Sequence, residues 1–277
     1  MEILIKNILK MIRAKIVSLL LIGLVLSCNT AKKEKAAETE EAETEVVETD
    51  MAMAPNTLSE AEAAEGWKLL FDGETSTGWR SYGKDTFPEG WIIEDGMIHC
   101  PGSGRGEAGG KDRGDILYDQ EFSNFHLKLE WKISEGGNSG IFYLGQESDE
   151  LDFIWKTAPE MQVLDNEKHP DAQMGTNGNR QAGSLYDLIP AQPQNAKPVG
   201  EWNQVEIMVY KGSVWHKQNG EKVVEYHLWT PEWNEMVAGS KFPGLNENWA
   251  DVASQGYFGL QDHGDDVWFR NIKIKEL

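Results

Sequence analysis

From residue 66 onward the chain is a succession of short runs rich in aromatic and β-branched residues, separated by Gly, Asn, Asp and Pro. Runs of this length are too short for core helices and are typical of β-strands. Hardly any helix-length pattern lies between them, so the sequence predicts an all-β sandwich or jelly roll. The ten expected strands lie within residues 66–74, 90–100, 125–134, 139–145, 159–165, 204–212, 213–220, 221–229, 256–264 and 267–277.

The segments between these runs carry residues that tight turns require. EDG at 94–96 and QNG at 218–220 place Asp-Gly or Asn-Gly where a two-residue hairpin turn needs positive φ. One helix is expected over residues 231–239, because Thr230 can cap its start and Gly239 can close its end.

Residues 1–28 have the pattern of a secretory signal. Four basic residues precede an apolar run at 16–26, which is too short for a comfortable membrane span. The run ends in VLSC at 25–28, which resembles the lipobox of bacterial lipoproteins, where the Cys becomes acylated. We therefore expect an exported lipoprotein, anchored through Cys28 on the periplasmic or outer-membrane face. Met11 is an alternative start.

Residues 29–65 are dominated by Ala, Glu, Thr and Lys. Between 31 and 65 there are three basic and eleven acidic residues, and too little apolar surface to offset the entropy of ordering. The composition predicts a disordered acidic tether, so that residues 66–277 form one β domain. The alternative is a charged helix, which Ala and Glu favour, although no apolar stripe is present for packing.

The composition excludes one class of partner and suggests another. A formal charge of -20 and a pI near 4.7 argue against nucleic acid, which needs clustered Lys and Arg. The eleven Trp residues can stack on sugar rings or fill a core. Cys100 is expected to be a small buried residue, since no cysteine spacing suggests a disulfide or metal site. The Trp residues in expected loops are Trp155, Trp229, Trp233 and Trp249.

The segment 157–169 (TAPEMQVLDNEKH) has the highest density of proton-handling and sugar-binding groups. Successive side chains of a strand point to opposite faces, so Glu160 and Gln162 project together. Acidic, amide and imidazole groups follow at the end of the strand. The alternative is a solvated outer face that runs into a charged turn. The residues that follow the strand are Asp165, Asn166, Glu167 and His169.

Two other expected strands offer polar faces. In the run at 256–264, alternation places Gln261 and His263 on one face. If this strand neighbours the one that carries Glu160, a carboxylate, two amides and an imidazole converge. Glu130 and Lys132 form a third polar pair, for which the alternative is a solvent-facing edge. For His263 the alternative is a turn histidine bonded to nearby backbone.

Six motifs, in their order along the chain, are GWKLLFDGE, GNSGIFY, PEMQVLDNEKHPDA, AGSLYDLIP, KPVGEWNQVEI and GLQDHGDDVWFRNIKI. Their order and spacing resemble the 3-keto-disaccharide hydrolase family, also described as 3-keto-glycoside hydrolases or lyase/hydratases. The resemblance spans essentially residues 66–277. It implies a concanavalin A-like lectin/glucanase jelly roll in an exported lipoprotein of glycan-degrading bacteria.

The resemblance also implies the cleavage of 3-keto-glycosides, by hydrolysis or by elimination followed by hydration. A ketone at carbon 3 acidifies the proton on carbon 2, so the reaction needs a base, an acid and a group that holds the enolate. Glu160 and His263 are the expected base and acid, in either order, and Lys132 or a bound divalent cation would stabilise the enolate. The other expected substrate-binding residues are Gln162, Asp165, Asn166, His169, Gln261, Asn138 and Tyr186.

A non-catalytic carbohydrate-binding lipoprotein on the same sandwich is the alternative function, because one fold hosts many functions. A small carbohydrate is the expected partner in both cases, and the membrane is contacted only through the anchor on Cys28. A divalent metal is compatible with the resemblance, but the spacing does not choose its ligands. The residues of ligand type are Glu160, Asp165, Glu167, His169 and His263.

Overall fold

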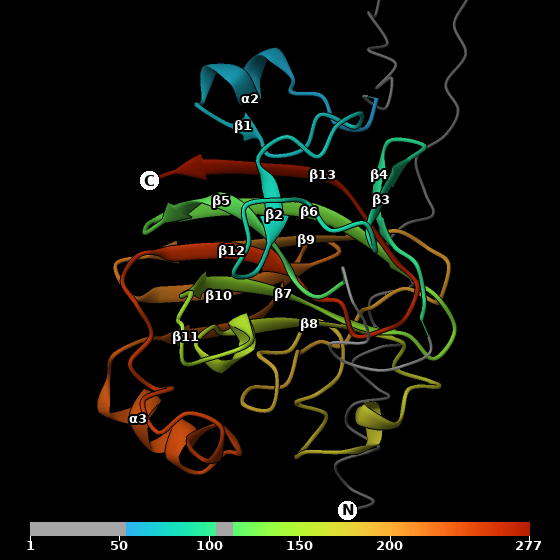
Figure 1. The fold of residues 1–277 in the computed structure, drawn as a ribbon. Coiled ribbons are helices and arrows are strands. Elements are labelled where there is room, and N and C mark those ends of the chain that lie inside the picture. The colour runs from blue at the N-terminus through green and yellow to red at the C-terminus, as the bar shows by residue number, and fades with distance from the viewer. Residues whose placement is uncertain (1–53, 104–112) are drawn as a thin grey trace, which may run out of the picture. The chain divides into compact units, whose positions relative to one another are not determined.

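The computed structural model describes residues 54–103 and 113–277, which form two antiparallel β-sheets packed face to face (Figure 1). The predicted all-β sandwich of the concanavalin A-like type is thereby confirmed. The five-stranded sheet has the order β2 (Trp79–Ser81), β5 (Ile116–Phe122), β12 (Gly256–Leu260), β7 (Asn138–Gly145) and β8 (Glu160–Leu164). The eight-stranded sheet has the order β11 (Glu221–His227), β10 (Ser213–Gln218), β9 (Asn203–Tyr210), β6 (Phe125–Ile133), β13 (Val267–Glu276), β4 (Met97–Cys100) and β3 (Ile92–Glu94), and β1 (Lys68–Leu69) pairs with β13.

Alternation along the strands builds the core between the sheets. In β6, Leu127, Leu129 and Trp131 are buried in this core, while the side chains that alternate with them point outward. Met161 and Val163 of β8 enter the same core from the opposite sheet. Because side chains alternate along β8, the inward direction of Met161 and Val163 places Glu160 on the outer face of the five-stranded sheet. A smaller apolar cluster covers part of that outer face, and it contains Leu117, Phe142, Ile154 and Ala158.

Three strands differ from the sequence-based expectation. The run at 90–100 is a hairpin of β3 and β4, in which Asp95 and Gly96 form the turn with φ values of 47° and 73°. β2 and β5 are strands that the sequence patterns do not predict. β5 escapes prediction because Asp119 and Gln120 interrupt its apolar pattern on the exposed side.

Residues 54–65 pack on the sandwich, so the prediction of a disordered tether is wrong for this segment. Helix α2 (Glu60–Ala64) begins with a capping box, and its Glu62 pairs with Lys273 of β13 at 2.9 Å. Asn56 and Asn271 exchange hydrogen bonds of 2.6 and 2.8 Å between backbone N–H and side-chain Oδ1 atoms. The charged-helix alternative is therefore right over α2. The remaining part of the predicted tether and the signal segment lie outside the described residues.

The predicted helix is present as α3 (Pro231–Ala238). Its cap is Thr230, whose Oγ1 accepts from the Trp233 N–H at 3.1 Å, and Gly239 follows its end. Trp233 begins a stack of aromatic rings that continues through Trp249 to Phe242. Because each of these three rings is nearly fully buried, the stack fixes the irregular segment after α3 against the rest of the protein.

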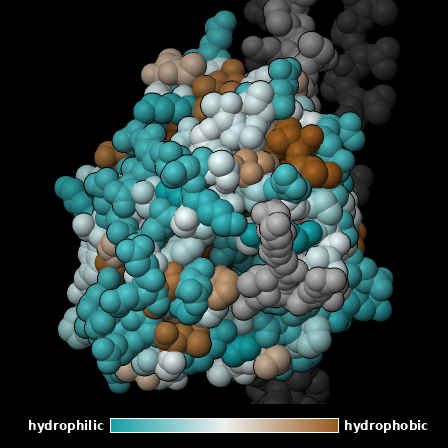
Figure 2. All heavy atoms as spheres, in the orientation of Figure 1, coloured by the Kyte–Doolittle hydropathy of each residue, from teal (hydrophilic) through white to brown (hydrophobic). Residues whose placement is uncertain are grey.

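The surface agrees with the acidic composition. Figure 2 shows the face of the molecule that is turned to the viewer in Figure 1, where most residues are hydrophilic and hydrophobic patches are small. Within residues 54–103 and 113–277 no helix has both the length and the apolar character needed to cross a membrane.

A chain of three polar side chains lies between the sheets, of which His216 and Tyr143 are buried and Tyr226 is partly buried. His216 Nδ1 donates to the carbonyl oxygen of Gly183 at 3.1 Å, so its Nε2 accepts the hydroxyl hydrogen of Tyr143 at 2.8 Å. Tyr143 in turn lies 2.7 Å from the hydroxyl of Tyr226. Burial disfavours the imidazolium form and lowers the pKa of His216 to about 4.

The buried His216 predicts a loss of stability on acidification. Below about pH 6.5 the unfolded chain binds a proton at this residue, while the folded protein does not until about pH 4. The stabilisation is therefore complete above pH 6.5, and about 3 kcal/mol is lost as the pH falls to 4. Urea unfolding at a series of pH values measures this loss. His216→Gln should flatten the dependence between about pH 6.5 and 5, where carboxylates hardly titrate. An unchanged dependence in that variant would contradict the assignment.

Candidate active site

A pocket opens on the outer face of the five-stranded sheet. Its volume is about 230 Å³, which is the scale of one sugar ring with its water rather than of a long glycan chain. Side chains from β7, β8 and the segments after α3 and β12 contribute to it. The lining residues are Asn138, Trp155, Glu160, Gln162, Tyr186, Lys241, Phe242, Leu245, Gln261 and His263.

The floor of the pocket depends on Gly140. β7 lies between β8, which carries Glu160, and β12, which Gln261 follows. The two strands are therefore not neighbours, although the sequence analysis had considered that they could be. Gly140 pairs with Gln162 across β8 and its carbonyl accepts from Gln261 N–H at 3.0 Å. A Cβ at Gly140 would lie 2.1 Å from Glu160 Oε1. Because Gly140 has no side chain, the Glu160 carboxylate can occupy the space above it, between β8 and β12.

Glu160 is a buried carboxylate, with 7% of its surface exposed. Glu160 lies close enough to Tyr186 to affect its titration. Burial is the main cause that raises the pKa of Tyr186 well above its usual value, and the negative charge of Glu160 is the next. Tyr186 N–H also donates to the Glu160 carbonyl at 3.0 Å, which holds the connector 183–189 along the edge of β8. A carboxylate in such surroundings suits proton transfer, because few water molecules compete for it.

Two amide oxygens in the pocket have no hydrogen-bond donor among the described residues. They are Oδ1 of Asn138 and Oε1 of Gln261, on side chains that are 3% and 5% exposed. A buried oxygen without a donor is costly, typically by about 1–3 kcal/mol. Hydroxyl groups of a bound ligand would satisfy both oxygens.

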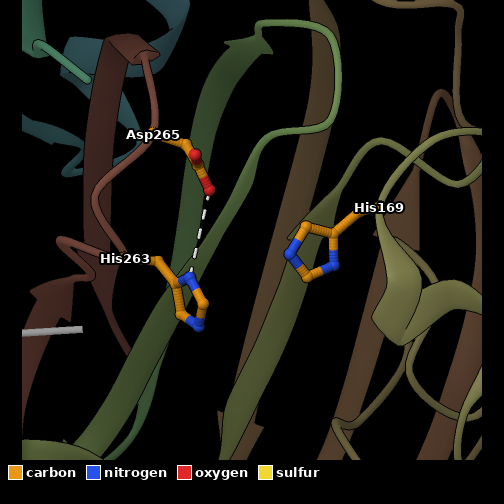
Figure 3. Close-up of side chains that lie close together, drawn as sticks. All are labelled: His169, His263 and Asp265. Atoms are coloured by element: carbon orange, nitrogen blue, oxygen red, sulfur yellow. Dashed lines mark ion pairs between the residues drawn. The ribbon is translucent and has the colours of Figure 1, made fainter. Parts of the chain in front are cut away.

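His263 lies beside Asn138, whose Nδ2 approaches the imidazole Nε2 at 3.3 Å. An amide nitrogen only donates, so neutral His263 carries its proton on Nδ1, which faces Asp265 at 3.9 Å. The ring of His169 stands perpendicular to that of His263, with 5.9 Å between the centroids. Figure 3 shows His263 and Asp265 on one segment and His169 on another, with the three side chains directed toward one another.

His169, His263 and Asp265 could hold a metal ion. One ligand atom from each lies within 4.8 Å of the other two, and two imidazoles with a carboxylate are ligands that Zn²⁺ and similar ions accept. The residue types and their spacing fit such an ion. His169 Nδ1 accepts from the Asp171 N–H at 3.1 Å, so its neutral ring is protonated on Nε2. If His169 bound an ion through Nε2, its ring proton would move to Nδ1. Nδ1 could then no longer accept the hydrogen bond from the Asp171 N–H.

The other end of the pocket carries a hydrogen-bond chain. Lys241 Nζ donates to the Tyr186 hydroxyl at 3.0 Å, and this hydroxyl donates to Asp171 Oδ2 at 2.8 Å. Asp171 is held in turn by Arg180 Nη1 at 3.1 Å. The Lys241 ammonium lies 4.3 Å from the centre of the Tyr186 ring. The Tyr186 hydroxyl thereby links Lys241, which is exposed, to the Asp171–Arg180 ion pair.

The apolar wall consists of Trp155, Phe242 and Leu245. Trp249 anchors two of them: its ring stacks on Phe242 at 3.9 Å, and its Nε1 donates to the Trp155 carbonyl at 3.0 Å. Aromatic faces of this kind pack against the C–H face of a sugar ring.

The structure brings most of the sequence-predicted site residues together. The two proposed catalytic residues and four predicted binding residues line this pocket, namely Glu160, His263, Gln162, Gln261, Asn138 and Tyr186. His169 lies beside His263, outside the lining set. Trp155 is the loop Trp that reaches the pocket, whereas Trp233 and Trp249 are buried in the aromatic stack.

Three predicted substrate-binding residues lie elsewhere, and these predictions are corrected. Lys132 points outward from the eight-stranded sheet, on the opposite side of the sandwich, and its ammonium lies over Trp202 and Trp268. Asp165 accepts from the backbone N–H groups of the turn that follows β8, and Asn166 Oδ1 accepts from the Ala182 N–H. Both acceptors are used by the fold itself.

Four residues at the site were missed by the sequence analysis: Asp265, Lys241, Phe242 and Leu245. Asp265 belongs to the DHGD turn, where its acidity could have been noted. The other three follow the predicted helix in a segment without periodicity, and no sequence signal places them over β8.

Comparison with known proteins agrees with this geometry. The profile of the 3-keto-alpha-glucoside-1,2-lyase-like domain matches residues 66–275. A Bacteroides thetaiotaomicron protein named 3-keto-disaccharide hydrolase is 48% identical over 275 residues, covering 92% of this chain and 95% of its own. A solved candidate glycosyl hydrolase from Parabacteroides distasonis is 31% identical with a TM-score of 0.70, covering 81% of this chain and 100% of its own. A second from the same organism is 29% identical with a TM-score of 0.59, covering 76% and 99%. The chain therefore belongs to the family of the 3-keto-alpha-glucoside-1,2-lyase-like domain.

Proposed function

We propose that this protein is an enzyme that cleaves the glycosidic bond of 3-keto-disaccharides. The observation that carries the proposal is the meeting of Glu160, Gln261 and His263 in one pocket of about 230 Å³, although Glu160 lies on β8 and the other two follow β12, on the other side of β7. Family membership and the name of the Bacteroides relative support it.

The reaction that suits this pocket is elimination followed by hydration. A base removes the proton on carbon 2, which the neighbouring ketone acidifies. The bond from carbon 1 to the glycosidic oxygen then breaks, and this oxygen keeps the electron pair and takes a proton from an acid. Water adds across the resulting double bond, with its hydroxyl on carbon 1 and a proton on carbon 2, to give the free 3-keto sugar. Ordinary glycosidases instead flank the bond with two carboxylates.

We assign the base to Glu160 and the acid to His263. An ionised carboxylate accepts a proton, and an imidazolium can give one, so the two groups suit opposite roles. The donor-free oxygens of Asn138 and Gln261 would accept from sugar hydroxyls. Trp155 and Phe242 would pack on the ring. These contacts orient the substrate so that its carbon 2 proton faces Glu160.

A divalent cation held by His169, His263 and Asp265 is an alternative role for His263, because an imidazole bound to an ion no longer serves as the acid. Such an ion would supply Lewis-acid polarisation of a substrate oxygen. His263 would bind it through Nδ1, and its ring proton would then reside on Nε2.

Titration of the protein with Zn²⁺ or Mn²⁺ is expected to show one bound ion per chain. His169→Ala and Asp265→Asn should each weaken binding by at least about tenfold, because each removes one ligand. Glu167→Gln is the matched control, since this exposed carboxylate lies outside the group and should leave binding unchanged. Equal affinities in all three variants, or no binding, would contradict the cation site and leave the sugar chemistry standing.

The function is tested by incubating the protein with a 3-keto disaccharide and with the same disaccharide before oxidation. Cleavage of the oxidised sugar alone supports the proposal, because only the ketone acidifies carbon 2. Equal cleavage of both would indicate an ordinary glycosidase, and cleavage of neither would favour the carbohydrate-binding alternative.

We also propose that the protein is exported and anchored by a lipid on Cys28, on the strength of the signal pattern and the VLSC motif at 25–28. Labelling cells with a tagged fatty acid tests this. A Cys28→Ala variant that keeps the label would contradict it.

A further inference from the structure

A cationic side chain from the segment after α3 lines the pocket. Among the described residues that line it, Lys241 is the one with a permanently cationic side chain. Toward a ligand, Glu160 presents oxygen acceptors. Asn138 and Gln261 present an oxygen acceptor and an uncharged amide N–H donor each. Among these lining side chains, Lys241 is therefore the cationic partner for a substrate oxygen that gains negative charge.

The contacts of Lys241 leave part of its ammonium available. An ammonium has three N–H bonds, and one of them is directed to the Tyr186 hydroxyl at 3.0 Å. The hydrogen of that hydroxyl goes to Asp171, so its lone pairs face Lys241. The cation–π contact with the ring of Tyr186, at 4.3 Å, further limits the motion of this otherwise flexible side chain. Tyr186 is thus a positioning residue for Lys241.

Lys241 and Glu160 both line the pocket and are linked through Tyr186. Tyr186 binds Lys241 through its hydroxyl and bonds to the Glu160 carbonyl through its N–H at 3.0 Å. The Glu160 charge also acts on the Tyr186 phenol. His263 instead lies beside Asn138, which is opposite Leu164 at the far end of β8. Tyr186 therefore groups the ammonium of Lys241 with the strand that carries the base.

This grouping matches the requirements of deprotonation next to a ketone. When the base takes the carbon 2 proton, the electron pair moves to the oxygen on carbon 3, which is the adjacent carbon. The base and the group that binds this oxygen must therefore lie close together, whereas the acid must reach the leaving group on carbon 1. Lys132, the cation that the sequence suggested for this role, is on the other side of the sandwich.

We propose that Lys241 binds the ketone oxygen and stabilises the enolate formed when Glu160 removes the carbon 2 proton. The inference rests on the proposed function and adds a catalytic residue to it. Lys241 donates a charge-assisted hydrogen bond that strengthens as negative charge develops, so it acts more on the transition state than on the bound substrate.

The test compares Lys241→Ala with the wild-type protein on a 3-keto disaccharide. Loss of one donor to a developing oxyanion lowers kcat by about 10²- to 10³-fold in other enzymes, and we expect a loss of that size with a smaller change in KM. Added ethylammonium, which can occupy the vacated space, should restore part of kcat. The matched control is Lys211→Ala, because Lys211 is also an exposed lysine over a tyrosine ring, at 5.1 Å from Tyr210, outside the pocket.

Three outcomes would overturn the assignment. A kcat of Lys241→Ala within about threefold of wild type would show that the ammonium is dispensable, well short of the expected loss. A rise in KM without a fall in kcat would show that Lys241 contributes only to binding. If the wild-type protein leaves the 3-keto disaccharide intact, the proposed function fails, and this assignment with it. In the first two cases wild-type turnover persists, so the proposed function survives.

Discussion

Glu160→Gln is expected to reduce turnover of a 3-keto disaccharide by about 10²- to 10⁴-fold, the usual contribution of a positioned general base. Gln has nearly the same shape as Glu, so it can remain in the space above Gly140 and preserve the buried contacts of β8. It cannot accept the carbon 2 proton at neutral pH. Steady-state kinetics measures the loss, and calorimetric titration with the intact substrate measures whether binding persists.

This variant also separates the enzyme from the carbohydrate-binding alternative. An enzyme loses kcat and keeps most of its affinity, because Asn138, Gln261 and the apolar wall remain. A binding protein has no turnover to lose. The matched control is Glu167→Gln, the same change in an exposed residue of the turn that follows β8. A Glu160→Gln enzyme with more than about a tenth of wild-type kcat would contradict the role of this carboxylate as the base.

Gly140→Ala is expected to be the second most damaging change. The new Cβ would lie 2.1 Å from Glu160 Oε1 and 2.7 Å from its carboxyl carbon, far inside contact distance. The end of the Glu160 side chain is the movable partner in this clash, so the carboxylate leaves its place while the strands stay paired. We expect kcat to fall by about 10²-fold, the order of loss that a misplacement of about 1 Å can cause. The free energy of unfolding should fall by no more than about 1–3 kcal/mol, the usual cost of overpacking.

Two further variants identify the cause of that loss. Gly239→Ala is the control, because a Cβ there meets its nearest backbone oxygen at an ordinary 3.6 Å. In a Glu160→Gln background, Gly140→Ala should cost far less activity than in the wild type, because both changes act on the same carboxylate. Fully additive losses in the double variant would mean that Gly140 matters for another reason.

The sequence predicted the parts of the site that obey a strand period. Alternation placed Glu160 with Gln162 and, on another strand, Gln261 with His263, and the structure brings all four into the pocket. Alternation cannot say which strand lies between them. The role of Gly140 depends on strand order, and nothing in its local sequence reveals it.

The failures have physical causes of the same kind. Lys132 points outward as alternation predicts, but a sandwich has two outer faces and the local pattern does not distinguish them. Lys241 and Phe242 depend on the stack of Trp233, Trp249 and Phe242, which joins residues through tertiary packing alone. Asn56 binds Asn271, 215 positions away, and this contact holds a segment whose composition predicted disorder.

The most direct measurement is cleavage of a 3-keto disaccharide in D₂O, followed by NMR at carbon 2 of the released keto sugar, with exchange in enzyme-free substrate subtracted. Removal of the carbon 2 proton by Glu160 and hydration of the double bond predict one solvent deuterium per product at that position, and no enzymatic incorporation with Glu160→Gln. Release of product at the full rate with its original hydrogen still on carbon 2 would contradict the mechanism, because the bond would then have broken without any step at that carbon.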